Sequence, residues 1–150
     1  MGSEMCIRDS NLLISGDQIL PRISSNISLW YTEPDGDPLR HYLESFEKFW
    51  PLPEDVLVLP SHDYPFYGLH GRLDDLRAHH QVRLDTAVKL CANPQTAADV
   101  IPSLFDREIG TFEFGFAIGE TLAHLNYLVT DGALERRRDT DGVIRYRQVA

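Results

Sequence analysis

The chain has 150 residues, of which 43% are hydrophobic, and its formal net charge is −9. This apolar content is typical of a chain that buries a core, so disorder along the whole chain is excluded. No apolar run approaches the ~18 residues of a membrane-spanning helix and no secretory leader opens the sequence, so we expect a soluble, cytoplasmic protein with no membrane partner.

Charge distribution and cysteine spacing restrict the possible partners and metal ligands. Residues 11–75 carry eleven acidic and four basic side chains, whereas residues 76–150 carry ten and nine. Because an acidic surface repels phosphate backbones, nucleic-acid binding by the first half would need a metal or a local basic patch. The charge of the nearly neutral second half neither favours nor excludes nucleic-acid binding. Cys6 and Cys91 lie far apart and outside any C-x-x-C spacing, so any metal would depend on His, Asp and Glu.

The first ten residues show no periodicity and lead abruptly into an apolar run. Residues 5–10 resemble translated sequencing-adapter sequence. On this interpretation residues 1–10 are an artefactual leader and the natural chain is truncated here, whereas the alternative is an ordinary disordered, frayed terminus. In either case we expect no function for these residues.

Residues 11–65 have the pattern of an α/β unit. The apolar runs 12–14 and 56–59 predict buried strands, and the loose alternation over 23–30 predicts another. Between them, a helix is expected to begin at Asp37-Pro38, and its wide apolar face continues to Trp50.

The chain becomes mainly helical near residue 70. The elements expected here are helices over about 72–91, 95–105 and 118–129 and a hairpin with strands 134–138 and 143–147 around an Asp-Gly turn. Two helices followed by a hairpin are typical of a winged-helix module. We therefore predict an α/β domain over 11–91 and a small winged-helix-like domain over 92–150.

Two polar side chains follow apolar strands, and they carry the candidate chemistry. Asp17 comes after the first strand and His62 after the strand that ends at Pro60. Ligands bind at the carboxyl edge of α/β sheets, and a carboxylate with a neutral imidazole is a suitable pair for zinc. We also interpret the preceding Gly16 as a residue that lets backbone and metal approach closely. From the residues alone, a turn-capping aspartate and a histidine bonded to a backbone carbonyl remain open alternatives.

The motifs Ser15-Gly16-Asp17 and, some 45 residues later, Leu59-Pro60-Ser61-His62 resemble the last two metal-ligand motifs of metallo-β-lactamase-fold hydrolases. Residues 37–45 and 73–84 resemble helices of the same family, and residues 119–128 resemble a helix of its winged-helix C-terminal extension. The resemblance covers roughly residues 11–147. It implies the C-terminal half of the family's α+β sandwich, followed by a small winged-helix domain.

The resemblance also implies roles for single residues. Asp17 matches the carboxylate that bridges two metal ions, which the resemblance implies to be zinc, and His62 matches the last histidine ligand. The implied activity is hydrolysis of an ester, thioester or related bond in a small-molecule substrate. The family's His-x-His-x-Asp-His motif and a further single histidine do not occur in this sequence, and Ser61 and Asp63 replace glycines often seen beside the last histidine. We therefore expect an inactive C-terminal fragment that binds zinc poorly.

Other functions and other metal ligands are alternatives to the hydrolase with Asp17 and His62 as ligands. The alternatives are a winged-helix nucleic-acid-binding protein and a metallo-β-lactamase-fold nuclease. Five arginines in the hairpin favour nucleic-acid binding. Four acids in the same stretch and a preceding helix without Lys or Arg argue against it. A third hypothesis makes the extension a dimerisation or substrate-covering module, and the sequence does not fix the oligomeric state. His80 and His124 are predicted to be packed structural residues, and His70 a loop residue.

The isolated half of a sandwich is expected to leave apolar strand residues uncovered. We expect this for Leu12, Ile14, Val56 and Val58, which precede the two candidate ligands in the strands.

Overall fold

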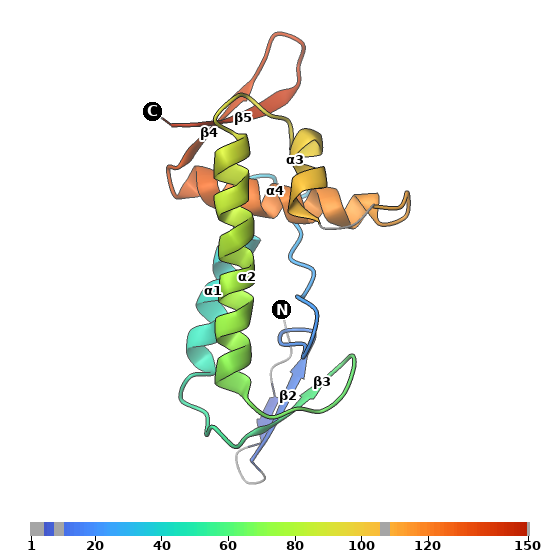
Figure 1. The fold of residues 1–150 in the computed structure, drawn as a ribbon, viewed down its shortest axis with the longest axis vertical. Coiled ribbons are helices and arrows are strands. Elements are labelled where there is room, and N and C mark those ends of the chain that lie inside the picture. Colours follow the sequence, from blue (N-terminus) through green and yellow to red (C-terminus); the bar gives the residue numbers. More distant parts are fainter. Residues whose placement is uncertain (1–4, 8–10, 106–108, 150) are drawn as a thin grey trace. The chain divides into compact units, whose positions relative to one another are not determined.

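Figure 1 shows the computed structural model, which describes residues 5–7, 11–105 and 109–149. The chain forms two compact units. The sheet unit comprises residues up to Ser25 together with Leu43–His79, and the helical unit comprises Asn26–Tyr42 together with His80–Ala150. The two units interleave along the sequence, whereas the predicted domains are consecutive, and the predicted domain division between residues 91 and 92 stays a prediction.

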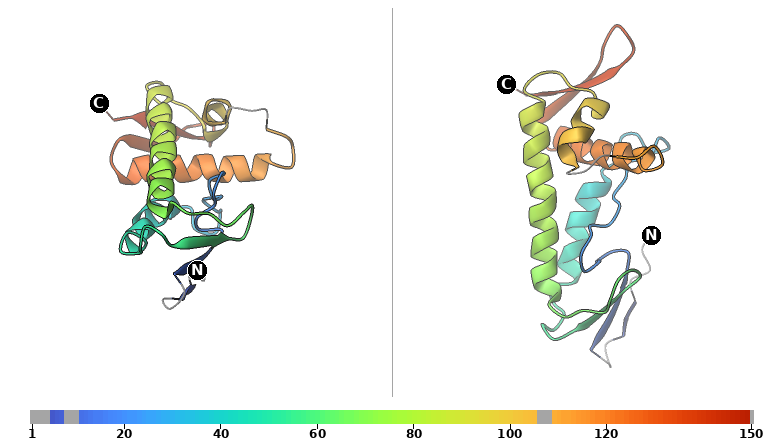
Figure 2. Two further views of the ribbon diagram at one scale, coloured as in Figure 1. Left: turned by 60° about the horizontal axis from the view of Figure 1, so that its bottom comes forward. Right: turned by 45° about the vertical axis from the view of Figure 1, so that its right-hand side comes forward.

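The sheet unit contains a three-stranded sheet in the order β1-β2-β3 (Figure 2). Its strands are β1 (Met5–Ile7), β2 (Leu12–Gly16) and β3 (Leu57–Pro60). The strands β2 and β3 are parallel and confirm the two predicted apolar strands, whereas β1 pairs antiparallel with β2 and was not predicted. The rest of the predicted leader, residues 1–4 and 8–10, lies outside the described residues.

The two faces of this sheet differ in burial. Leu13 and Val58 are paired across β2 and β3 and both are 0% exposed, while Val56, two residues before Val58, is 2% exposed. Because side chains alternate between the faces of a strand, Val56 and Val58 share the buried face with Leu13. The expectation that these two valines lie uncovered was therefore wrong. The opposite face carries Ile14, which is 37% exposed, as predicted.

The predicted strand over residues 23–30 does not form. In the sheet unit, the Arg72 guanidinium donates to the carbonyl oxygen of Ile23 at 2.9 Å. In the helical unit, the backbone N–H of Leu29 donates to the carbonyl of Gly119 at 2.9 Å. The Ile23 carbonyl is thus bonded to a side chain, and the Leu29 N–H to a carbonyl of a helix. Because these backbone groups already have partners, the alternation of the side chains does not lead to sheet pairing.

The helix predicted to begin at Asp37-Pro38 is α1 (Pro38–Ser45), which continues as the 3-10 helix η2 (Phe46–Lys48). Asp37 accepts the backbone N–H of Arg40 at 3.1 Å, and its second carboxyl oxygen pairs with the Arg40 guanidinium at 2.9 Å. This is N-terminal capping by an aspartate followed by proline in the first helical position.

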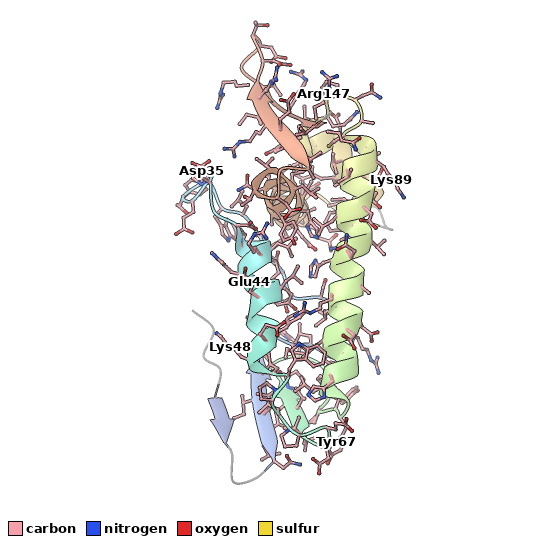
Figure 3. All side chains as sticks on the ribbon, turned by 90° about the vertical axis from the view of Figure 1, so that its left-hand side faces the viewer. Asp35, Glu44, Lys48, Tyr67, Lys89 and Arg147 are labelled. Atoms are coloured by element: carbon pink, nitrogen blue, oxygen red, sulfur yellow. The ribbon has the colours of Figure 1, made fainter. Side chains whose placement is uncertain are left out.

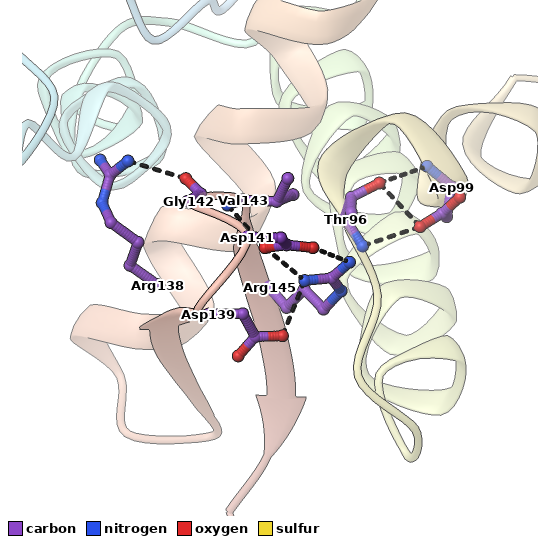
Figure 4. Close-up of polar contacts among 8 residues, drawn as sticks. All are labelled: Thr96, Asp99, Arg138, Asp139, Asp141, Gly142, Val143 and Arg145. Atoms are coloured by element: carbon purple, nitrogen blue, oxygen red, sulfur yellow. Dashed lines mark hydrogen bonds and ion pairs between the residues drawn. The ribbon is translucent and has the colours of Figure 1, made fainter.

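The remaining predicted elements are confirmed, with bounds of α2 (Leu69–Leu90), α3 (Ala97–Leu104), α4 (Phe114–Thr130), β4 (Leu134–Arg138) and β5 (Ile144–Gln148). Lys89 lies in the last turn of α2, where a cation interacts favourably with the helix dipole (Figure 3). A reciprocal capping box between Thr96 and Asp99 starts α3 (Figure 4). Within the described part of the chain, no helix is both long and apolar enough to span a membrane.

A close approach fixes the position of α4 in the helical unit. A Cβ atom on Gly119 would lie 2.9 Å from the side chain of Ser28, and the next residue, Leu29, donates its N–H to the Gly119 carbonyl. Only a residue without a side chain lets the two backbones lie this close without a local shift.

Candidate metal centre

Asp17 and His62 follow the two parallel strands of the sheet unit at the same edge. The ladder extends past β3 because the N–H of Ser61 donates to the carbonyl of Gly16 at 3.1 Å. Asp17 and His62 are the residues immediately after this last bonded pair. The carboxyl edge of a parallel strand pair therefore brings them together, as the sequence predicts.

The geometry of this pair fits two ligands of one metal ion. His62 Nε2 lies 3.4 Å from Asp17 Oδ1, and the two side chains are 67% and 70% exposed. With zinc–ligand distances of about 2.0–2.2 Å and tetrahedral angles, two ligand atoms of one ion lie about 3.3–3.6 Å apart. The imidazole and the carboxylate are also suitable zinc donors, and their exposure leaves room for further ligands.

Ser61 positions the carboxylate of Asp17. Its hydroxyl donates to Asp17 Oδ1, the same oxygen that faces His62. A hydrogen bond of this kind fixes the orientation of a ligand side chain and so supports metal binding without contact to the metal itself. Ser61 was expected only as a replacement for glycine, and the signal that would have revealed this contact is its place directly after Pro60, which pairs with Gly16 in the strand register.

Left-handed backbone conformations shape both loops of the pair. Gly16 has φ +55°, and nothing lies within 4 Å of the position of an added Cβ. The backbone conformation of Gly16 therefore favours glycine before Asp17, and the expected close approach to a metal stays a prediction. Asp63 has φ +67°, which is uncommon for a residue with a side chain, and its carboxylate pairs with Arg22 at 3.2 Å.

No third ligand joins the pair in the part of the chain that the structure describes. No group of three or more His, Cys, Asp or Glu side chains there has the arrangement of a metal site. His70 stacks on Trp50, with ring centroids 5.1 Å apart, and His80 is buried in contact with His124. Cys91 is buried, which raises the pKa of its thiol to about 11 and keeps it protonated at neutral pH.

The sequence and the fold of the chain match known proteins. Residues 84–149 match a family described as "Metallo-beta-lactamase-like, C-terminal domain". A comparison with curated proteins gives no match.

Two solved structures are similar over nearly the whole chain. A beta-lactamase domain protein from Burkholderia ambifaria is 44% identical over 97% of this chain, with a TM-score of 0.94. A metallo-beta-lactamase family protein from Thermus thermophilus is 32% identical over 97% of this chain, with a TM-score of 0.82. This chain spans 44% of the length of each of these two chains.

These matches agree with the family that the motifs around Asp17 and His62 indicate. They rest on the C-terminal residues as well as on the strands that carry the candidate ligands. The chain thus resembles metallo-beta-lactamase-like C-terminal domains in sequence over residues 84–149, and its fold is that of the matching part of these two solved structures.

Proposed function

We propose that this chain supplies two ligands, Asp17 and His62, to the zinc centre of a metal-dependent hydrolase. The observation that carries the proposal is the 3.4 Å separation of His62 Nε2 and Asp17 Oδ1 at the carboxyl edge of two parallel strands. The substrate class is a small molecule with an ester, thioester or related bond. The proposed place of action is the cytoplasm.

The side chains of the pair have separate tasks in this proposal. When bound, the zinc ions polarise the scissile carbonyl or phosphoryl group and make water more acidic. Asp17 would hold the metal through its carboxylate, and His62 would hold it through its imidazole. Ser61 holds the Asp17 carboxylate in place through its hydroxyl. The remaining ligands are proposed to come from a His-x-His-x-Asp-His motif and a further histidine outside these 150 residues.

The proposal is tested by completing the fold. In a chimera, residues 11–150 replace the matching part of the Burkholderia ambifaria protein, to which this chain is 44% identical. We expect the chimera to bind two zinc ions per chain and to hydrolyse members of a panel of esters and thioesters. A folded, monodisperse chimera that binds no zinc, beside an unaltered relative that does, would contradict the proposal.

The isolated 150-residue chain is expected to retain well below one zinc per chain after dialysis. Two protein ligands do not satisfy a tetrahedral ion, and the described residues offer no group of three. Metal analysis of the dialysed chain is the measurement, with the chimera as its positive control. Stoichiometric zinc in the isolated chain would show that the ligand set is wrong.

The helical unit is proposed to contain a winged-helix-like module whose hairpin does not bind nucleic acid. Four arginines of this hairpin are bonded to groups of the same unit, namely Arg136, Arg137, Arg138 and Arg145. Arg145 pairs with Asp139 at 2.7 Å and with Asp141 at 3.0 Å (Figure 4), and Arg136 pairs with Asp35 at 2.6 Å. The bond from Arg136 to Asp35 is a contact with the acidic first half of the sequence. These ion pairs leave little net positive charge for phosphates.

We therefore expect weak binding of a DNA duplex with a shallow salt dependence. A protein that neutralises one or two phosphates should show a slope of log K against log salt of no more than about −2 in magnitude. Fluorescence anisotropy with a labelled duplex at several salt concentrations measures this slope. Tight binding with a steep slope would instead support the nucleic-acid-binding alternative.

A further inference from the structure

Arg22 places a positive charge beside the candidate metal centre. Its Nε atom lies 3.2 Å from the carboxylate of Asp63, which is the residue directly after His62. Because consecutive Cα atoms are about 3.8 Å apart, this contact keeps Nε within about 11 Å of the Cα atom of His62. The Arg22 side chain is 73% exposed, so it is open to a small molecule bound at the centre.

The segment that carries Arg22 is fixed by Arg72. The Nε atom of Arg72 donates to the carbonyl oxygen of Leu20 at 2.7 Å, and its Nη2 atom donates to that of Ile23 at 2.9 Å. Arg72 thus holds the backbone on both sides of Arg22. Since ordering a loop is part of the cost of binding a ligand, a segment that is already held lowers this cost.

The loop on the other side of the ion pair is closed by a backbone bridge. The N–H of Phe66 donates to the carbonyl of Val58 at 3.0 Å, and the N–H of Val58 donates to the carbonyl of Phe66 at 2.9 Å. This bridge closes the loop that carries Asp63 and Tyr64. The ring centroid of Tyr64 lies 6.0 Å from Cζ of Arg22, so the guanidinium contacts an aromatic ring as well as a carboxylate.

The contact with Asp63 uses only part of the planar guanidinium. It is made through Nε, whereas the two terminal nitrogens Nη1 and Nη2 form a fork that matches a planar carboxylate through two parallel hydrogen bonds. Residues 11–75 carry eleven acidic and four basic side chains, a net charge of −7. A singly charged carboxylate therefore meets less repulsion here than a doubly charged phosphate.

We propose that Arg22 binds a free carboxylate group of the substrate, so that the hydrolase acts on esters or thioesters of dicarboxylic acids. This inference rests on the proposed function and specifies its substrate class. The scissile group lies at Asp17 and His62, and the free carboxylate lies on the terminal nitrogens of Arg22. Arg22 selects and orients the substrate and takes no part in bond cleavage.

A comparison of charged and neutral esters in the chimera tests this site. The charged probes are the ethyl half esters of succinic, glutaric and adipic acid, and each is compared with the ethyl ester of the unbranched monocarboxylic acid of equal length. The quantity measured is the ratio of kcat/KM for the charged ester to kcat/KM for its neutral counterpart. In Arg22→Met this ratio should fall about 10- to 100-fold for the best half ester, because a charge-assisted bidentate contact is lost.

Arg77→Met is the matched control, because Arg77 makes the same two kinds of contact in the same unit. It pairs with the Glu47 carboxylate at 2.6 Å, and its Cζ atom lies 5.6 Å from the ring centroid of Phe46. This variant should leave the ratio unchanged. Zinc content and hydrolysis of the neutral esters report on the proposed function, whereas the ratio reports on Arg22. An active chimera whose ratio is the same with and without Arg22 would overturn the carboxylate site and leave the proposed function in place.

A second measurement needs neither turnover nor bound zinc. Glutarate is added to the full 150-residue chain and compared with sodium chloride at equal ionic strength, while NMR follows the guanidinium nitrogens and the tyrosine rings. Glutarate should shift the signals of Arg22 and Tyr64 more than those of Arg77, and in Arg22→Met the Tyr64 signals should no longer respond. Equal responses of Arg22 and Arg77 would show that Arg22 forms an exposed ion pair only, which would overturn the proposal.

Discussion

In the chimera that completes the fold, Asp17→Asn is expected to lower turnover by at least about a hundredfold and to reduce the zinc content. Loss of an outer-shell partner of a metal ligand already costs about 10- to 100-fold, so loss of a ligand charge should cost more. The asparagine side chain has one oxygen and no charge, and therefore neither bridges two cations nor offsets their repulsion. Steady-state kinetics and metal analysis of the same preparation measure both effects.

Asp63→Asn is the control for this substitution, because Asp63 is the other carboxylate beside His62 and pairs with Arg22 rather than with the candidate ligands. It should keep the zinc content of the unaltered chimera. His62→Asn, by contrast, should weaken chiefly one of the two ions, since its imidazole is proposed to bind only one. Unchanged activity and zinc content in Asp17→Asn would mean that the metal centre is assigned to the wrong residues.

The position of this pair could be predicted from the sequence because it depends on strand ends alone. Two apolar runs that form parallel neighbours bring the residues after them to one edge, whatever the surrounding loops do. The bonds from Ser61 to Asp17 and from Arg22 to Asp63 depend instead on loop conformations, including a positive φ at Asp63. No periodic pattern predicts such conformations, so these contacts required the structure.

The same contrast holds for the fold. The helices and the hairpin were predicted within a few residues because periodic apolar faces, caps and an Asp-Gly turn are local signals. The segment 23–30 has strand-like alternation, but its backbone bonds to Arg72 and Gly119, which are distant in the sequence. Likewise, the burial of His80 and His124 was predicted from their helix faces, whereas their pairing depends on how two helices pack.

A buried ion pair in the helical unit gives the second large expected effect. Arg83 and Glu120 form a salt bridge in which the side chains are 16% and 12% exposed, and the Arg83 guanidinium lies 4.9 Å from the ring centroid of Phe105. Burial raises the pKa of Glu120, and the nearby Arg83 partly offsets this rise. The Arg83 guanidinium therefore favours the charged form of the Glu120 carboxyl group.

Arg83→Met is expected to lower the free energy of unfolding by about 3–5 kcal/mol at pH 7.5, because it leaves a buried carboxylate without a counter-charge. Removal of Arg83 raises the pKa of Glu120 further above its unfolded value, so this loss should shrink as the pH falls through that raised pKa and the carboxyl group becomes neutral. The double variant Arg83→Met with Glu120→Met should recover most of the stability. Urea unfolding at pH 7.5 and 5.5 measures all three chains.

Arg137→Met provides the control, because Arg137 pairs with Glu135 on the hairpin surface and its side chain is 73% exposed. Exposed ion pairs contribute little, so this variant should change the free energy of unfolding by no more than about 0.5 kcal/mol. If Arg83→Met cost no more than Arg137→Met, the Arg83–Glu120 bond would be a surface pair in solution. The helical unit would then be held together by its apolar core and the two histidines, without a contribution from buried charge.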